Sequence, residues 1–185
     1  ICLPKTAWPP TSLGCGIQTG AGAVLNRLKP AFGSSIAVFG CGTVGMSAIM
    51  AAHLCPCKNI IAVSGNEESL ALAKELGATH GINRKTCGDV VAEIKKITGG
   101  GADYAIDTSG VPDMVKKALA SVKFLGTAVV LGVTGDLTIN VQEELMGEGK
   151  SLIGIVEGDS NPKLFIPQLI SYYKEGRFPF DRLIH

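Results

Sequence analysis

The chain has 185 residues, 46% of them hydrophobic and 18% charged, with a formal charge of +1. The length suits one domain with a sizeable core, the balanced charge argues against a nucleic-acid binder, and no apolar stretch approaches the roughly 18 residues that a membrane helix needs. Because the six cysteines are too few for a disulfide scaffold and no signal peptide is evident, we expect a cytoplasmic protein.

Residues 1–30 form a lead-in segment that we expect to be helical. Three prolines make the first ten residues loop-like, Thr11 or Ser12 can cap a short helix, and residues 20–28 predict a second helix that ends before Pro30. Residues 31–185 then alternate between apolar runs and segments of helical period. The predicted strands are 36–39, 59–63, 79–83, 104–106, 127–131 and 152–156, and the predicted helices are 44–54, 67–76, 90–98, 112–121 and 162–175.

Strand starts lie about 20 to 25 residues apart, a spacing that fits βα units. Continuous apolar strands are typical of a parallel sheet that helices cover on both faces. The 24 glycines, against an average usage of roughly 7%, fit many tight turns between strands and helices. The pattern therefore predicts an α/β domain with a doubly wound, six-stranded parallel sheet, the Rossmann fold.

A glycine-rich loop at residues 40–45 follows the first predicted strand and opens a predicted helix. In this context Gly40 makes the tight turn, Gly42 lets the backbone approach a pyrophosphate, and Gly45 lets the helix pack closely on the strand. The first helical residues, Thr43 and Val44, offer free N–H groups to phosphates. The loop predicts dinucleotide binding, with a plain structural turn as the alternative.

The end of the second predicted strand breaks the usual pattern for NAD. An acid is expected there to hold the ribose 2′-hydroxyl, but the chain has Ser64, nineteen residues after Gly45. Ser64 would not repel a 2′-phosphate, and Gly65 and Asn66 offer N–H donors, so we favour NADP over NAD. Against NADP, no arginine follows directly and two glutamates are near. The alternative is that Ser64 only caps or turns the chain and NAD binds through other contacts.

Several of these stretches carry a family resemblance. Residues 14–26, the 40–45 loop with its offset to Ser64, and residues 75–80 resemble the zinc-dependent medium-chain alcohol dehydrogenases. Residues 99–104, 109–112 and 155–160 look most like the aryl-alcohol (benzyl alcohol) branch. The resemblance covers essentially the whole chain, and residues 14–26 are its most specific part.

The resemblance implies roles for particular residues. Cys15 matches the one catalytic-zinc ligand that this half of the chain supplies, and Thr19 matches a residue packed against the nicotinamide ring. Leu131, Gly132 and Val133 match a strand end whose backbone contacts the carboxamide. In the intact enzyme, zinc would lower the pKa of a bound primary alcohol, with aromatic and allylic alcohols as candidates. The alcohol would pass hydride to NAD(P) and become an aldehyde.

The chain also departs from the family. The other zinc ligands, the proton relay and the structural-zinc lobe belong to an N-terminal catalytic domain that this sequence lacks, and the family's final segment is missing after His185. Since the chain also begins with Ile1, we expect a piece of a longer protein that is inactive alone. The intact enzyme is expected to be a homodimer or homotetramer, because residues 152–156 would form an edge strand.

Other reactive residues have plainer interpretations. Cys55 and Cys57 suggest a metal or redox motif, but they lack a second pair, so we interpret them as a helix end. Cys41 is expected to pack in the glycine loop, and the remaining candidates, His53, His80, Asp103 and Asp107, are interpreted as structural. Two other functions stay open: a zinc-free quinone or enoyl reductase, and a nucleotide-sensing regulatory module without chemistry.

Overall fold

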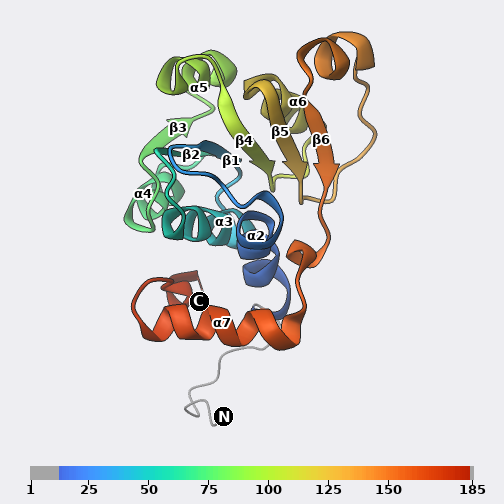
Figure 1. Ribbon diagram of the computed structural model, residues 1–185. Coiled ribbons are helices and arrows are strands. Elements are labelled where there is room, and N and C mark those ends of the chain that lie inside the picture. The colour runs from blue at the N-terminus through green and yellow to red at the C-terminus, as the bar shows by residue number, and fades with distance from the viewer. Residues whose placement is uncertain (1–12, 184–185) are drawn as a thin grey trace.

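The computed structural model describes residues 13–183, and Figure 1 shows a twisted sheet between layers of helices. The six strands lie in the order β3-β2-β1-β4-β5-β6, and neighbouring strands are parallel. This order confirms the predicted doubly wound α/β fold. The strands are β1 (Ser35–Phe39), β2 (Asn59–Ser64), β3 (His80–Asn83), β4 (Ala102–Asp107), β5 (Val122–Val130) and β6 (Ser151–Gly154).

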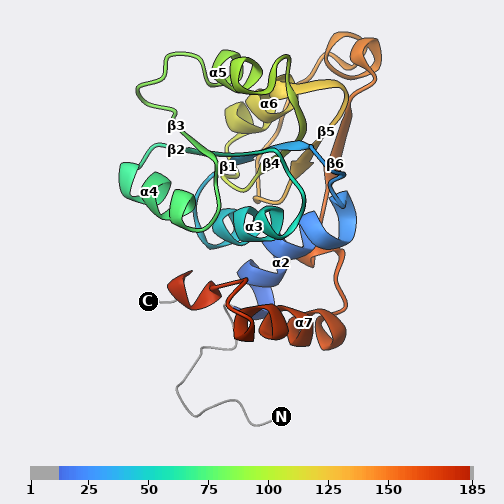
Figure 2. The same cartoon turned by 60° about the vertical axis from the view of Figure 1, so that its left-hand side comes forward.

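Helices cover both faces of the sheet (Figure 2). Each face has its own cluster of buried apolar side chains. One cluster gathers side chains of α2, α3, α4 and α7, and the other gathers those of α5 and α6. Strand β1 is buried along its whole length, which explains its continuous apolar sequence. The helices are α2 (Gln18–Gly22), α3 (Thr43–Leu54), α4 (Glu67–Glu75), α5 (Val90–Thr98), α6 (Pro112–Ser121) and α7 (Pro162–Lys174).

The lead-in segment differs from the prediction of two short helices. The structure has one unbroken helical run, made of η1 (Leu13–Ile17), α2 and η2 (Ala23–Leu28). The residues at the two junctions, Ile17 and Gly22, both have right-handed helical backbone angles, so nothing separates the parts. The run ends at Lys29 in a left-handed conformation, just before Pro30 as predicted. The predicted cap, Thr11 or Ser12, and the predicted N-terminal loop lie outside the described residues.

The last two strands also begin or end away from the predicted positions. Strand β5 begins at Val122, directly after α6, rather than at residue 127. Strand β6 ends at Gly154 rather than residue 156, because the chain leaves the sheet for a turn in which Glu157, Gly158 and Asp159 all have positive φ. Sequence reasoning also missed two helical turns between these strands, η3 (Val141–Leu145) and η4 (Met146–Glu148).

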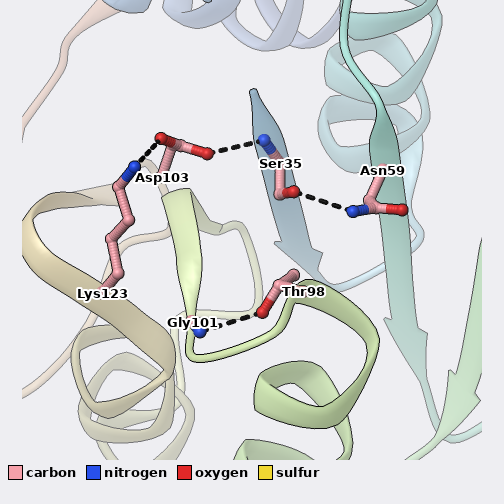
Figure 3. A network of polar contacts seen from close by, with 6 residues as sticks. All are labelled: Ser35, Asn59, Thr98, Gly101, Asp103 and Lys123. Atoms are coloured by element: carbon pink, nitrogen blue, oxygen red, sulfur yellow. Dashed lines mark hydrogen bonds and ion pairs between the residues drawn. The ribbon is translucent and has the colours of Figure 1, made fainter. Parts of the chain in front are cut away.

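A polar network joins the amino ends of several strands (Figure 3). Since Ser35 begins β1 and the glycine loop follows Phe39, the network lies at the opposite end of the sheet from that loop. Asp103 accepts a hydrogen bond from the Ser35 N–H at 2.8 Å and pairs with the Lys123 ammonium at 2.5 Å. Asn59 donates to the Ser35 hydroxyl at 2.9 Å. These contacts join β1, β2, β4 and β5, and they give Asp103 the structural role that the sequence predicted.

Candidate cofactor site

The strand register brings the predicted cofactor residues to one edge of the sheet. Phe39 of β1 pairs with Val63 of β2 on one side and with Asp107 of β4 on the other. Asp107 in turn pairs with Val130 of β5. The segments that follow these strands begin at residues 40, 65, 108 and 131 and therefore lie along the carboxyl edge, where open α/β sheets bind ligands.

The glycine loop has the geometry that the sequence predicts. Gly40 has φ of +100°, and its N–H donates to the Val63 carbonyl at 2.9 Å, which extends the pairing of β1 with β2 by one residue into the turn. A Cβ at Gly45 would lie 1.9 Å from the Gly40 oxygen, whereas a Cβ at Gly42 would meet no atom within 4 Å. Gly42 and Thr43 are exposed at the start of α3, whose first turn contains no acidic residue. The helix therefore presents uncompensated N–H groups beside an open glycine.

Beyond the loop, β2 ends at Ser64 beside a pocket of about 160 Å³. Gly40, Ser64 and Gly65 contribute to its lining. Burial raises the pKa of the neighbouring Cys41 thiol to about 11, and a hydrogen bond with Ser64 offsets part of this rise. Cys41 is half-buried against the core, as predicted, and stays protonated at neutral pH.

Two basic residues that the sequence analysis missed lie beside Ser64. Ser64 pairs with Asn83 of β3, so the chain leaving β3 passes next to Gly65, and the Arg84 N–H donates to the Ser64 carbonyl at 2.9 Å. A Cβ at Gly65 would lie 3.3 Å from Arg84 Nε and 2.9 Å from Lys85 Cε. Among residues 13–183, neither cation forms an ion pair. Arginine does not follow Ser64 in sequence, but it does line the same pocket.

On the other side of β1, the segment after β4 is built around a buried carboxylate. Asp107 is fully buried and accepts hydrogen bonds from the Ser109 hydroxyl at 2.6 Å and the Gly110 N–H at 3.1 Å. Its backbone carbonyl accepts from the Leu131 N–H at 2.9 Å, which holds the predicted segment 131–133 against the end of β4. Gly132 is packed on Gly110, while the Val133 side chain is fully exposed at the edge.

The lead-in helix packs directly on the glycine loop. A Cβ at Gly20 would lie 2.0 Å from the Val44 oxygen, and a Cβ at Gly16 would lie 3.2 Å from the Thr43 methyl carbon. Cys15 is exposed next to this contact, and Thr19 is nearly buried one turn further on. The candidate zinc ligand and the candidate phosphate loop are therefore adjacent.

The remaining candidate residues lie where the sequence analysis placed them. Helix α3 ends at Leu54, and Cys55 is its C-cap residue, so the Cys55–Cys57 pair marks a helix end. Burial raises the pKa of Cys57 to about 12, with smaller contributions from Cys55 and Asp103. His53 lies in α3 and His80 at the start of β3. Within residues 13–183, no three His, Cys, Asp or Glu side chains gather as a metal-binding group.

Comparison with known proteins identifies the family. The profile of the zinc-binding dehydrogenases matches residues 43–171, so the chain belongs to this family. Its cofactor-binding domain is the part that this fold represents, and the predicted family resemblance is confirmed.

Three known proteins illustrate this similarity. Geraniol dehydrogenase from Castellaniella defragrans is 41% identical over 174 residues, which cover 93% of this chain and 47% of that protein. The crystal structure of benzyl alcohol dehydrogenase from Acinetobacter calcoaceticus superposes with a TM-score of 0.91 at 44% identity, covering 99% of this chain and 51% of the other. An alcohol dehydrogenase zinc-binding domain protein from Burkholderia ambifaria gives a TM-score of 0.90 at 49% identity over 98% of this chain and 50% of the other.

The chain spans about half the length of these relatives. They support its assignment as the cofactor-binding domain of a zinc-dependent alcohol dehydrogenase. None of the helices in the described part of the chain has the length and apolar character needed to cross a membrane.

Proposed function

We propose that this chain forms the cofactor-binding half of an enzyme that oxidises a primary alcohol to an aldehyde. The contact between the Cys15 segment and the glycine loop carries the proposal, because it would place a zinc-bound alcohol beside a dinucleotide. In that reaction the alcohol loses its hydroxyl proton and a hydride, and the hydride reduces the nicotinamide ring. The relatives named geraniol and benzyl alcohol dehydrogenase support an allylic or aromatic alcohol as the substrate class.

The proposed cofactor contacts follow the carboxyl edge of the sheet. Gly40, Gly42 and Gly45, with the first N–H groups of α3 at Thr43 and Val44, receive the pyrophosphate. The open space at Gly42 and the absence of an acid in the first turn of α3 support this role. The nicotinamide end lies between Thr19 and the segment of Leu131, Gly132 and Val133.

We further propose NADP as the preferred cofactor. Ser64 supplies a hydroxyl where an NAD enzyme has a carboxylate, and the Gly65 and Asn66 backbone completes the turn. Arg84 and Lys85 supply two positive charges beside this turn that form no ion pair with residues 13–183. This arrangement answers the objection that no arginine follows Ser64, because the cation comes from the end of the neighbouring strand.

Cys15 fits the role of one zinc ligand, since its thiol is exposed between two glycines and borders the cofactor loop. One thiolate fills one position of a tetrahedral site. Bound zinc supplies a Lewis acid that lowers the pKa of the substrate alcohol. The other ligands come from the catalytic domain that we propose precedes residue 1, with residues 1–30 as the segment that leads into the Rossmann domain.

The intact enzyme is proposed to be a homo-oligomer that joins through β6. This strand is the last in the sheet order, and its outer edge has no partner strand among the described residues. Val156, just beyond the strand, is 79% exposed.

All five cysteines in the described part of the chain are free, which supports a reducing, cytoplasmic location.

A binding and turnover assay tests the central proposal. Calorimetric titration of the chain with NADP and NAD is expected to give saturable, one-to-one binding of a dinucleotide. Alcohol-dependent reduction of either cofactor by the chain alone, with zinc added, is expected to be absent. Adding the missing segments from the same reading frame is expected to restore turnover of benzyl alcohol or geraniol. A chain that binds neither cofactor would contradict the proposal, and turnover by the chain alone would contradict the assignment as half of an enzyme.

A further inference from the structure

A left-handed turn after β6 is docked on the helical lead-in segment. Glu157, Gly158 and Asp159 have φ values of +51°, +67° and +47°, a conformation that is costly for residues other than glycine. A Cβ at Gly158 would lie 2.5 Å from the Gln18 carbonyl oxygen and 2.8 Å from the Gly22 Cα. The turn and the helix are therefore in backbone contact, and neither surface has room for a side chain.

The buried amide of Gln18 links this turn to the start of the helix. Gln18 is only 2% exposed, and its Nε2 donates at 2.7 Å to the Gly14 carbonyl and at 2.7 Å to the Glu157 carboxylate. An amide nitrogen has two protons, so both are used here. Ser160 donates to the Glu157 carbonyl at 2.6 Å and contacts the Gln18 Oε1 at 3.4 Å. The network ends one residue before Cys15.

Two further contacts hold the same turn at the far end of the helix. Asn26 donates to the Gly158 carbonyl at 3.2 Å, and Arg27 lies 3.5 Å from Asp159. These contacts are remote from Cys15 in sequence. In contrast, the Gln18 amide that donates to Glu157 also donates to the carbonyl of Gly14, the residue before Cys15. The structure therefore offers one contact that bears on the Cys15 position and another that bears only on the attachment of the turn.

We propose that Glu157 is a positioning residue which, through Gln18, fixes the helix start that carries Cys15 against the cofactor loop. The proposal rests on the proposed role of Cys15 as a zinc ligand. A carboxylate oxygen suits this task because it accepts one amide proton of Gln18 and so orients the other proton toward the Gly14 carbonyl. When Glu157 is replaced by a residue without an acceptor oxygen, one N–H of the buried Gln18 amide loses its partner. The first turn of the helix is then free to shift. Substitution of a residue that supports a metal ligand typically lowers the metal affinity by about 10- to 100-fold.

The test uses the enzyme that contains this chain together with its catalytic domain. Zinc release to a chromogenic chelator and the melting temperature are measured for Glu157→Leu, Glu157→Gln and Asn26→Ala. Glu157→Leu is expected to release zinc at least tenfold faster, while Glu157→Gln, which keeps an acceptor oxygen, stays within about threefold of wild type. Asn26→Ala is the matched control: it loosens the same turn, so it is expected to lower the melting temperature and leave zinc release unchanged.

Hydrogen exchange of the chain itself gives an independent readout. Glu157→Leu is expected to speed exchange at residues 14–20 more than in the core strands. Wild-type zinc release in Glu157→Leu, or faster release in Asn26→Ala of equal size, would overturn the positioning role. Cys15→Ser separates this outcome from failure of the proposed function. If Cys15→Ser leaves the zinc content and release rate unchanged, Cys15 is not a ligand and both proposals are wrong.

Discussion

Replacing Ser64 with aspartate is expected to convert the proposed preference for NADP into a preference for NAD. The new carboxylate would lie at the end of β2, beside Gly65 and within the pocket that Arg84 lines. With NAD, the carboxylate can accept hydrogen bonds from the ribose hydroxyls. With NADP, it repels the 2′-phosphate and also neutralises part of the charge of Arg84. Both effects act against NADP, so the substitution separates the two cofactors more than it weakens dinucleotide binding as a whole.

The size of the effect follows from the charges. Two unit charges about 5 Å apart repel by about 3 kcal/mol at an effective dielectric constant of 20. Solvent around the exposed Arg84 and Lys85 reduces this value. A serine hydroxyl contributes only about 0.5–1.5 kcal/mol through its hydrogen bond. We therefore expect the ratio of the two dissociation constants to change at least tenfold towards NAD, which corresponds to about 1.4 kcal/mol.

Calorimetric dissociation constants for both cofactors, with wild type, Ser64→Asp and Arg84→Gln, measure this change. Arg84→Gln is expected to weaken NADP and leave NAD nearly unchanged, and Ser64→Thr is the control that keeps a hydroxyl without adding charge. A wild-type chain that already prefers NAD tenfold would refute the reasoning. Ser64 would then be a turn residue, and the cations beside it would have no part in cofactor choice.

Three further outcomes are expected. Gly42→Ala should weaken dinucleotide binding at least tenfold and leave the melting temperature unchanged, whereas Gly45→Ala should lower both the affinity and the melting temperature. The reason is that only a Cβ at Gly45 would clash with the Gly40 oxygen, so equal melting temperatures for the two variants would contradict this. The intact enzyme should be at least a dimer by light scattering; a wild-type monomer at micromolar concentration would contradict pairing through β6. Burial alone raises the pKa of Asp103, but hydrogen bonds from Lys123 and Ser35 outweigh it and hold the pKa below the ordinary value. The difference in unfolding free energy between wild type and Asp103→Asn should therefore be full above pH of about 4 and shrink as the pH falls through the lower folded pKa; a difference that is constant down to pH of about 2 would contradict this.

Much of the fold could be predicted from sequence because its signals are local. The strand β1 is a continuous apolar run, and the glycine loop follows it at once. Helices α4, α5 and α7 begin at local capping residues, which are Asn66, Asp89 and Asn161. The predicted limits of α5 and α6 match the structure, since Asp89 caps α5 and Pro112 opens α6. Boundaries went wrong where tertiary contacts decide them. In the lead-in helix, Gly20 packs on α3 and Gly22 packs on Gly158, and β6 ends early where its turn docks on that helix.

The candidate site divides in the same way. Composition, the spacing of Gly40, Gly42 and Gly45, and the missing acid at Ser64 are properties of neighbouring residues, so the sequence by itself predicted a dinucleotide site and a change in its ribose recognition. Only the tertiary structure decided what surrounds it. Arg84 reaches Ser64 because parallel pairing aligns the ends of β2 and β3, although twenty residues separate the two in the chain. Glu157 reaches Gln18 across 139 residues because the turn after β6 returns to the first helix. Such contacts depend on strand order and register, which no local pattern encodes.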